Sequence, residues 1–375
     1  MKKKNKILSL IKVISSILIV LFITIAVFLY FNLQVTDTFK NSDHVEFIIE
    51  EGSYGKEVLN KLKNENIIKN SELTYYYAKL FADTDFKSGR FVIPTTLNLK
   101  GLLNYLCCEE NAKPNTVTLT IVEGSFATEI ASILSNNLNI DYNELIDSWS
   151  NEAFVRQLMI DYPFLTEDIF DPNIKIYLEG YLFPSTYEFN FNSSIETVTR
   201  TFLNGSRNIY EKYLNNFENS PVFYHYDDDE YREASIHEIF TLASILQWES
   251  GSLDEMDKIS SVFYNRLNKP EILGSTVTSC YSAGLTKEEC GIVGDNLEYT
   301  WREDGYTYNT YTKQGLPIGP VLSPGEDSIV AALNPADTDY FYFVGDICEG
   351  TGTIFASTYS EHEYNIEKYV NCSFD

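Results

Sequence analysis

Histidine and closely spaced cysteine are scarce in this chain, and their scarcity limits the chemistry that it can carry. The sequence has four histidines and six cysteines, and the only close cysteine pair is the adjacent Cys107 and Cys108. The spacings typical of zinc sites, His-Glu-x-x-His and Cys-x-x-Cys, are absent from the sequence. We therefore expect no bound metal and no cofactor.

Three other catalytic motifs are missing as well. The sequence has no Gly-x-Ser-x-Gly elbow, which argues against a serine hydrolase. It has no Gly-x-Gly-x-x-Gly and no phosphate-binding loop, which argues against a nucleotide-dependent enzyme. Of the common types of catalysis, these absences leave acid–base chemistry by carboxylates.

Basic residues are also few, at 28 lysines and arginines against 54 acidic residues, for a formal net charge of −26. A protein that binds nucleic acid needs a basic surface to neutralise phosphates, so we expect no nucleic-acid partner. An anionic cell-wall polymer would gain no electrostatic attraction either. A glycan would have to be held by hydrogen bonds and by stacking on the 27 tyrosines.

The N-terminus carries the clearest physical signal. A basic segment, residues 1–12, precedes an uncharged and mostly apolar run from Val13 to Thr36, which is long enough to cross a bilayer as a helix. No small-x-small cleavage pattern follows before Asp37. By the positive-inside rule, residues 1–12 stay in the cytoplasm and the rest lies outside. The sequence thus predicts an uncleaved single-pass anchor in the cell membrane, followed by a short polar spacer at 37–43.

Outside the membrane disulfides are permitted. A bond between Cys280 and Cys290 would close a short loop, and one between Cys348 and Cys372 would hold the C-terminal tail, but the sequence does not fix either pairing.

One pattern occurs twice after the anchor. Residues 45–62 (VEFIIEEGSYGKEVLNKL) and 117–134 (VTLTIVEGSFATEIASIL) share a valine, Glu-Gly-Ser, an aromatic residue, a later glutamate and a final leucine. Each copy begins with strand-like alternation, turns at Gly-Ser and continues with helical spacing. The pattern predicts a duplicated strand–turn–helix module, and the alternative is a chance similarity of two β-α units. The stretch 109–115 is a candidate linker. Further along the chain, residues 274–281 (GSTVTSCY) are predicted to be strand-like or extended, and residues 315–324 (GLPIGPVLSP) are too rich in proline and glycine for a helix or central strand, so they are predicted to form an ordered loop.

The segment from Ser235 to Gly251 (SIHEIFTLASILQWESG) predicts a helix that ends near Glu249. Ser235 and Glu238 form a possible capping box, and Gly251 is a natural helix stop. Glu249 stands beside Trp248, and a carboxylate against an aromatic surface loses hydration, which suits a general acid. On the helix alone, a solvated glutamate near a helix end is the commoner case.

Glu179 lies in an aromatic-rich segment, LEGYLFPSTYEF, that could form core and turn or could line a sugar groove. An external protein with carboxylates and abundant tyrosines favours a glycan substrate. Ordinary glycosidases need two carboxylates that flank the bond. A lytic transglycosylase can use a single glutamate, which first protonates the leaving oxygen and then takes the proton from the 6-hydroxyl of the same sugar.

Five segments resemble, in order, motifs of the MltG/YceG-like family of endolytic murein transglycosylases: LEGYLFPSTYEF, LASILQWES, SSVFYNRL, YNTYTKQGLPIGPVLSPGEDSIVAALNPADTDYFYFV and IFASTYSEHEYN. The similarity extends from about Val45 to Tyr369. It implies an α+β fold with an N-terminal transmembrane helix (13–36), a LysM-like β-α module (44–112) and a mixed α/β YceG-like catalytic domain (116–372).

The resemblance also implies roles for individual residues. The family's catalytic glutamate, in Ala-Ser-Ile-x-x-x-Glu, falls on Glu249. The expected substrate-binding residues are those of the groove and of the glycan-contacting loop: Glu179, Ser275, Thr276, Tyr308, Asn309, Thr310 and Tyr311. Ahead of Thr276 the family usually has Ser-Asp-Pro, whereas this chain has Leu273-Gly274-Ser275. Gln247 stands where many relatives have another glutamate.

The sequence therefore predicts an endolytic transglycosylase that cuts the β-1,4 bond between N-acetylmuramic acid and N-acetylglucosamine in nascent peptidoglycan and leaves 1,6-anhydro ends. Its expected partners are glycan strands, membrane-bound peptidoglycan synthases and the membrane itself. The alternative is a peptidoglycan-binding scaffold that no longer cuts.

Overall fold

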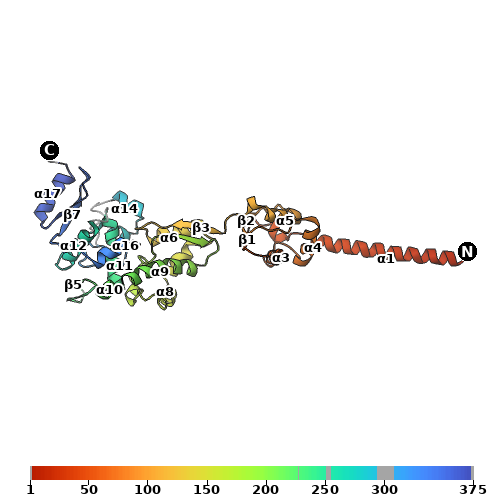
Figure 1. Cartoon of the computed structure of the whole chain (residues 1–375), viewed down its shortest axis with the longest axis horizontal. Helices are drawn as coiled ribbons and strands as arrows, with labels where there is room; N and C mark the ends of the chain where they lie inside the picture. The colour runs from red at the N-terminus through yellow and green to blue at the C-terminus, as the bar shows by residue number, and fades with distance from the viewer. Residues whose placement is uncertain (1, 227, 251–254, 294–307, 373–375) are drawn as a thin grey trace. The chain divides into compact units, whose positions relative to one another are not determined.

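The structure is a computed structural model, and it describes residues 2–226, 228–250, 255–293 and 308–372. The chain divides into two compact units, Met1–Thr116 and Val117–Asp375 (Figure 1). The predicted helix stop Gly251 lies outside the described residues. So do Ser252, which with Glu255 is a possible second capping box, and Tyr306 and Thr307, which begin the segment YTYNTY.

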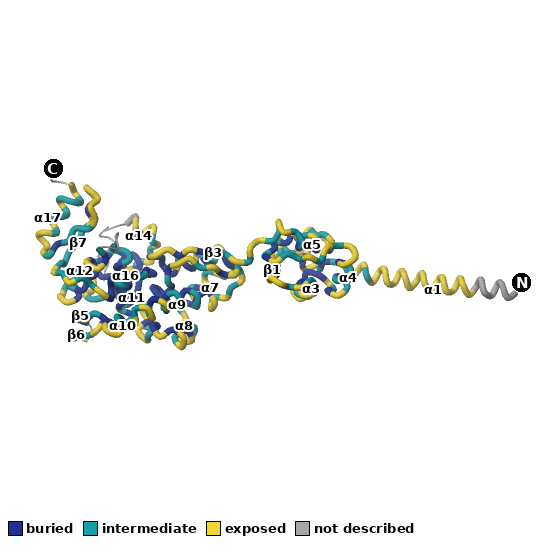
Figure 2. Tube along the Cα trace, in the orientation of Figure 1, coloured by how far each residue is buried: buried dark blue, intermediate teal, exposed yellow. Residues whose placement is uncertain are grey.

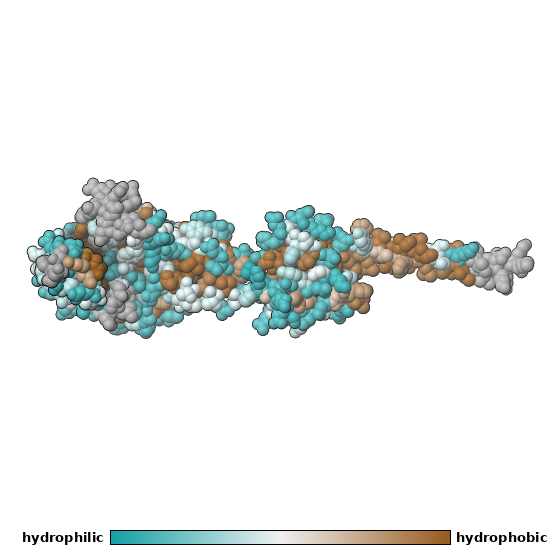
Figure 3. All heavy atoms as spheres, turned by 90° about the horizontal axis from the view of Figure 1, so that it is seen from above, coloured by the Kyte–Doolittle hydropathy of each residue, from teal (hydrophilic) through white to brown (hydrophobic). Residues whose placement is uncertain are grey.

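The first unit begins with one long helix, α1 (Lys2–Asn32). Its stretch Leu10–Asn32 has a mean hydropathy of 2.8 and is long and apolar enough to cross a membrane. The side chains of this stretch are exposed, and Figure 3 shows the hydrophobic colour along it. The helix ends at Asn32, four residues before the predicted end of the span, because Gln34 and Thr36 make backbone hydrogen bonds with residues 67–69 instead.

Two antiparallel strands and three helices form the rest of this unit. In chain order they are β1 (Val45–Ile49), α3 (Gly55–Asn64), α4 (Ser71–Phe81), β2 (Gly89–Ile93) and α5 (Leu99–Cys107), with short turns of helix at α2 (Asp37–Lys40) and η1 (Glu109–Asn111). Strand β1 pairs with β2, Phe47 opposite Phe91. The predicted polar spacer at 37–43 is wrong in part, because it contains α2 and buries Phe39 in the core of the unit.

In the second unit, β3 (Thr116–Thr120) pairs with β4 (Thr186–Asn190). Between these two strands in the sequence come the small helices α6 (Ala127–Asn137), α7 (Tyr142–Trp149), α8 (Glu152–Met159) and η2 (Glu167–Phe170). Then come α9 (Ile195–Lys212), α10 (Leu214–Glu218) and the hairpin β5 (Val222–His225) and β6 (Glu230–Glu233). The C-terminal part holds α11 (Ile236–Glu249), α12 (Met256–Leu267), α13 (Thr276–Ala283), α14 (Lys287–Val293), α16 (Glu326–Leu333), the hairpin β7 (Tyr342–Gly345) and β8 (Thr353–Ala356), and α17 (Tyr359–Tyr369).

Both copies of the repeated pattern form the strand–turn–helix that the sequence predicts. In each, the glycine of Glu-Gly-Ser has a positive φ, +79° at Gly52 and +75° at Gly124, which glycine adopts without strain. In each, the later glutamate closes the start of the helix: the carboxylates of Glu57 and Glu129 accept hydrogen bonds from the third preceding backbone N–H, both at 3.0 Å. The shared residues thus perform the same structural task twice.

Helix α11 is the central helix of the second unit. The predicted capping box is present: the Ser235 hydroxyl accepts a hydrogen bond from the N–H of Glu238, whose carboxylate accepts one from the N–H of Ser235. The apolar face predicted from spacing is only part of what is buried, because His237, Thr241 and Ser244 are buried too. Figure 2 shows α11 among buried segments, drawn in dark blue. A helix buried on all sides is a rigid support for the residue at its end.

The polar groups of α11 hold the Pro- and Gly-rich loop 315–324 in place. His237 lies 2.9 Å from the carbonyl oxygen of Ile318, the Ser244 hydroxyl accepts a hydrogen bond from the N–H of Val321, and the Gln247 side chain accepts one from the N–H of Gly325. The loop is free of helix and strand, as predicted, and α16 follows it.

Candidate active site

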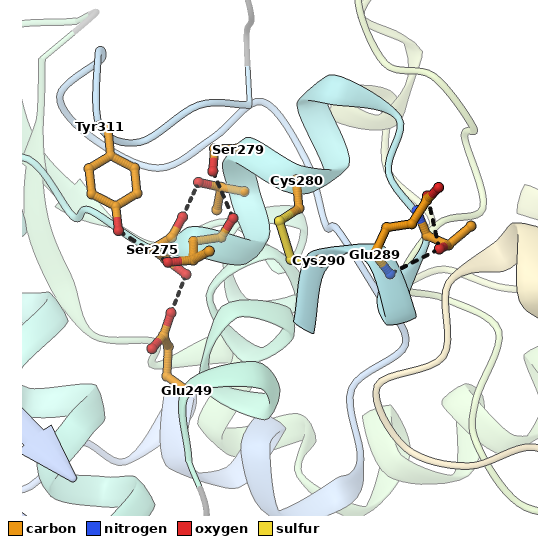
Figure 4. Close-up of a disulfide and its surroundings, with 10 residues drawn as sticks. Glu249, Ser275, Ser279, Cys280, Glu289, Cys290 and Tyr311 are labelled. Atoms are coloured by element: carbon orange, nitrogen blue, oxygen red, sulfur yellow. Dashed lines mark hydrogen bonds between the residues drawn. A yellow bond between two sulfur atoms is a disulfide. The ribbon is translucent and has the colours of Figure 1, made fainter. Parts of the chain in front are cut away.

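Glu249 is the last residue of α11, and its side chain is half-buried. The hydroxyl of Ser275, at the start of α13, donates a hydrogen bond of 2.5 Å to Oε1 of Glu249 (Figure 4). The two residues are 26 positions apart in sequence, so the contact depends on the tertiary fold. It places the carboxylate of Glu249 where α11 meets α13.

Ser275 is itself held in a fixed position. Its backbone N–H donates to the hydroxyl of Thr310 at 3.0 Å, and the N–H of Gly274 donates to the carbonyl oxygen of Thr310 at 3.2 Å. The Thr310 hydroxyl also lies 2.8 Å from that of Thr278 in α13. These bonds join the turn before α13 to the loop that contains Thr310. The Ser275 hydroxyl is therefore oriented toward Glu249 before any substrate arrives.

The segment 274–281 differs from its predicted extended conformation, because α13 begins at Thr276. Valine and threonine favour strands, but here the hydroxyls of Thr278 and Ser279 complete the first turn of a helix. Thr278 donates to the carbonyl oxygen of Ser275 at 2.7 Å, and Ser279 donates to that of Thr276 at 2.8 Å. Val277 and Cys280 fill the core beneath it.

The expected substrate-binding residues divide into two groups by exposure. Ser275, Tyr308, Asn309 and Thr310 are buried, each about 1% exposed, whereas Thr276 and Tyr311 are half-buried. The hydroxyls of Thr276 and Tyr311 lie 3.2 Å apart, and Figure 4 shows the Tyr311 hydroxyl directed toward the start of α13. The buried group fixes the loop, and the half-buried pair is the part that a ligand near Glu249 can reach.

The structure places Glu179 in the core and not at the edge of a groove. Its carboxylate is 1% exposed and accepts a hydrogen bond of 2.9 Å from the N–H of Ala127, at the start of α6. Burial raises the pKa of Glu179 to about 8. The aromatic segment around it is thus core and turn, which was one of the two interpretations open from the sequence.

Arg266 is a neighbour of Glu249 that the sequence alone did not single out. Its guanidinium donates to the carbonyl oxygens of Phe341 and Leu273 at 2.7 and 2.6 Å, so it braces the chain just before Ser275. Burial lowers the pKa of Arg266, and nearby acidic groups, Glu249 among them, oppose that change. Its place in the segment SSVFYNRL was the signal available in the sequence.

Gln247 has a structural task. Its Oε1 accepts hydrogen bonds from the N–H of Gly325 and the hydroxyl of Ser328, which holds the start of α16 against the end of α11.

A disulfide between Cys280 and Cys290 ties α13 to α14 beside this site (Figure 4). A second one joins Cys348 to Cys372 near the C-terminus. Both pairings are among those that the sequence left open. Within the described part of the chain no group of three or more His, Cys, Asp or Glu side chains gathers as metal ligands do.

A cavity of about 460 Å³ lies at the opposite end of α11 from Glu249. Ser235, His237 and Glu238 of that end line it, together with the hairpin β5–β6 and residues 313–318. It is therefore separate from the Glu249 site, although the chain that lines it continues directly from Tyr311.

Known proteins resemble this chain over most of its length. The model of the YceG-like family matches residues 47–368. The endolytic murein transglycosylase of Bacillus subtilis is 31% identical over 330 residues, which cover 87% of this chain and 85% of that protein. The protein of the same name from Streptococcus pneumoniae is 28% identical over 334 residues, and the match spans 58% of its length.

A crystal structure of the yceG-like protein lmo1499 from Listeria monocytogenes superimposes with a TM-score of 0.58 at 26% identity. The match covers 86% of this chain and 99% of that one.

Proposed function

Because this chain belongs to the YceG-like family, we propose that it is a membrane-anchored endolytic transglycosylase of peptidoglycan. The bond cut is the β-1,4 linkage between N-acetylmuramic acid and N-acetylglucosamine. The observation that carries the proposal is the position of Glu249: half-buried at the end of a rigid helix and hydrogen-bonded to an oriented hydroxyl.

Glu249 acts in two steps. As an acid it gives its proton to the glycosidic oxygen while the bond from the muramic acid carbon to that oxygen breaks. As a carboxylate it then takes the proton of the 6-hydroxyl of the same sugar, whose oxygen attacks that carbon and closes the 1,6-anhydro ring. The proton count balances, no water is consumed, and Glu249 ends protonated as it began.

Ser275 suits both steps because a hydroxyl can donate and accept. It can donate to Glu249 when Glu249 is a carboxylate, and it can accept from Glu249 when Glu249 is protonated. The carboxyl therefore keeps its orientation through the cycle. Thr276 and Tyr311 contact the glycan, while Tyr308, Asn309 and Thr310 hold the loop. Glu179 stabilises the start of α6 by accepting a hydrogen bond from the N–H of Ala127.

The N-terminal helix α1 anchors the enzyme in the cell membrane with residues 1–12 in the cytoplasm. Residues 44–112 form a LysM-like module, and the catalytic domain starts near residue 116. The order β1, α3, α4, β2 with an antiparallel pair supports that assignment. Anchorage keeps the site close to the membrane, where glycan strands are made, so cleavage ends strand elongation next to the synthases.

The test is to incubate the full-length protein in detergent with peptidoglycan and to look for 1,6-anhydromuramoyl ends by mass spectrometry. We expect these ends with the parent protein and a loss of about 10²- to 10⁴-fold with Glu249→Gln, the range for a missing general acid–base group. Equal product from Glu249→Gln would refute the assignment. Glu233→Gln, an exposed glutamate on β6, is the matched control.

One observation favours a second candidate, a peptidoglycan-binding scaffold without activity. Residues 273–275 are Leu-Gly-Ser where the family usually has Ser-Asp-Pro, directly beside Glu249. Retention on insoluble peptidoglycan without any anhydro product would support the scaffold.

A further inference from the structure

Helix α4 exposes large hydrophobic side chains that the fold does not use. Among the described residues 33–116, the large hydrophobic side chains most exposed to solvent are those of Tyr54 and of three residues on α4. The exposed fractions on α4 are 62% for Tyr76, 73% for Leu80 and 60% for Phe81. An apolar cluster of this kind on a small module marks a contact surface.

The opposite face of α4 already supplies the packing of the module. Ser71, Thr74 and Ala78 are buried against the core, whereas Tyr76 and Leu80 lie one helical turn apart on the outer face. Phe81 continues this surface at the end of the helix, where its ring contacts that of Tyr77, with 5.4 Å between the ring centres. The cluster therefore has no role in folding that would explain its exposure.

Backbone hydrogen bonds join the residues after the end of α1 to the residues just before the start of α4. The N–H of Thr36 donates to the carbonyl oxygen of Ile67 at 3.0 Å, and the N–H of Lys69 donates to that of Gln34 at 3.2 Å. Val35, between them, is 1% exposed and lies in the core of the module. Since Ser71 follows Lys69 by two residues, α4 starts beside the point where α1 ends.

We propose that the outer face of α4, formed by Tyr76, Leu80 and Phe81, lies in the interfacial layer of the bilayer that α1 spans. The proposal rests on the membrane anchorage proposed above. Helix α4 is about 15 Å long, so its whole face is within reach of the membrane surface at the end of α1. Figures 1 and 2 show α4 at the end of the module that adjoins α1.

The residue types fit that layer. Tyrosine is enriched at membrane–water interfaces, and amphipathic helices bury leucine and phenylalanine about 5–10 Å into the boundary of headgroups and chains. Lys79, on the same exposed side, has its ammonium 4.5 Å from the ring centre of Tyr75 and can reach lipid phosphates. This contact fixes the orientation of the module on the membrane, which a single spanning helix would leave free to tilt.

The experiment uses the full-length protein in vesicles of phosphatidylethanolamine and phosphatidylglycerol, with a spin-labelled lipid as quencher. A tryptophan is introduced by Leu80→Trp or, conservatively, by Tyr76→Trp, and the signal of the parent protein is subtracted. Glu51→Trp is the matched control. Glu51 is exposed and follows the end of β1, and the carboxylate of its neighbour Glu50 accepts a hydrogen bond from the side chain of Asn115. Phe22→Trp, in α1, reports anchorage.

With the label near the headgroups, we expect at least about twofold more quenching at position 80 or 76 than at position 51, as for interfacial side chains. Quenching at position 22 by a deeper label, with positions 80 and 76 no more quenched than position 51, would overturn this inference and leave the anchorage intact. No quenching at position 22 would overturn the anchorage and the inference together.

Discussion

The hydroxyl of Ser275 donates a hydrogen bond of 2.5 Å to Oε1 of Glu249. The resemblance described in the sequence analysis implies proline at this position in most members of the family. Proline has no hydroxyl and no N–H, so it could make neither this bond nor the one from the N–H of Ser275 to Thr310. The chain thus orients its acid with a group of its own. Because Ser275 is only 1% exposed, we propose that it acts through Glu249 and does not contact the glycan.

The first prediction concerns Ser275→Ala. Loss of a hydrogen bond to a charged group costs about 1.5–3 kcal/mol, which corresponds to roughly a 10- to 100-fold fall in kcat. We expect KM to stay unchanged, because the glycan does not touch this side chain. Steady-state release of anhydromuramoyl ends measures both constants.

Ser279→Ala is the control for this variant, since its hydroxyl is buried in the same helix and donates to the carbonyl oxygen of Thr276. A rise in KM at constant kcat in Ser275→Ala would contradict a positioning role and indicate direct contact with the substrate.

The second prediction follows from Gly180, in the aromatic segment that contains Glu179. Its φ is +81°, and an added Cβ would lie 2.3 Å from Cβ of Pro320 in the loop that α11 holds. Gly180→Ala should therefore lower the free energy of unfolding by several kcal/mol, which is more than the roughly 1 kcal/mol typical of a substitution. The causes are the strained φ of the new alanine and the clash of its Cβ with Pro320. Urea unfolding measures the loss. Gly284→Ala shares the positive φ but meets nothing within 4 Å, so a loss of equal size there would refute the clash.

Sequence patterns predicted the local features well. The capping box at Ser235 and Glu238, both strand–turn–helix copies and the loop 315–324 depend on neighbouring residues, and all of them are present. The extended conformation expected for 274–281 was wrong, because tertiary burial of Val277 and Cys280 overrides the β-propensity of this segment.

The candidate active site shows the same limit of prediction from local sequence patterns. Glu249 could be placed at a helix end from spacing, but its partner Ser275 is 26 residues away, and Arg266 acts from another helix. The aromatic residues around Glu179 left both a core and a sugar groove open, and the resemblance to the family implied the groove. Those residues instead form the core that buries Glu179, and composition cannot distinguish a stacking surface from a packed interior.

The third prediction concerns the disulfide between Cys280 and Cys290, which joins α13 to α14. Replacing both cysteines by serine frees a loop of about ten residues and should lower the unfolding free energy by about 2–3 kcal/mol, as expected for a bond that closes a short loop. Because α13 carries Ser275 at its start, activity should fall as well. Cys348→Ser with Cys372→Ser is the comparison, as that pair is near the tail: an equal fall in activity there would show a general effect.

The last prediction is a pH dependence of stability caused by Glu179. Burial raises its pKa from the ordinary value of 4.5 to about 8, so the folded protein binds a proton more tightly than the unfolded chain. Stability from this group is complete below pH 4.5, falls as the pH rises toward about 8, and is constant above that. The loss is at most about 5 kcal/mol, since each pKa unit corresponds to about 1.4 kcal/mol.

Glu179→Gln tests this dependence. Its amide oxygen can still accept the hydrogen bond from the N–H of Ala127, but it carries no charge at any pH. We therefore expect the variant to gain stability relative to the parent between pH 5 and 8, as measured by denaturant unfolding at a series of pH values. A constant difference between the two proteins across that range would mean that Glu179 keeps its charge in the core, and that burial does not control its protonation.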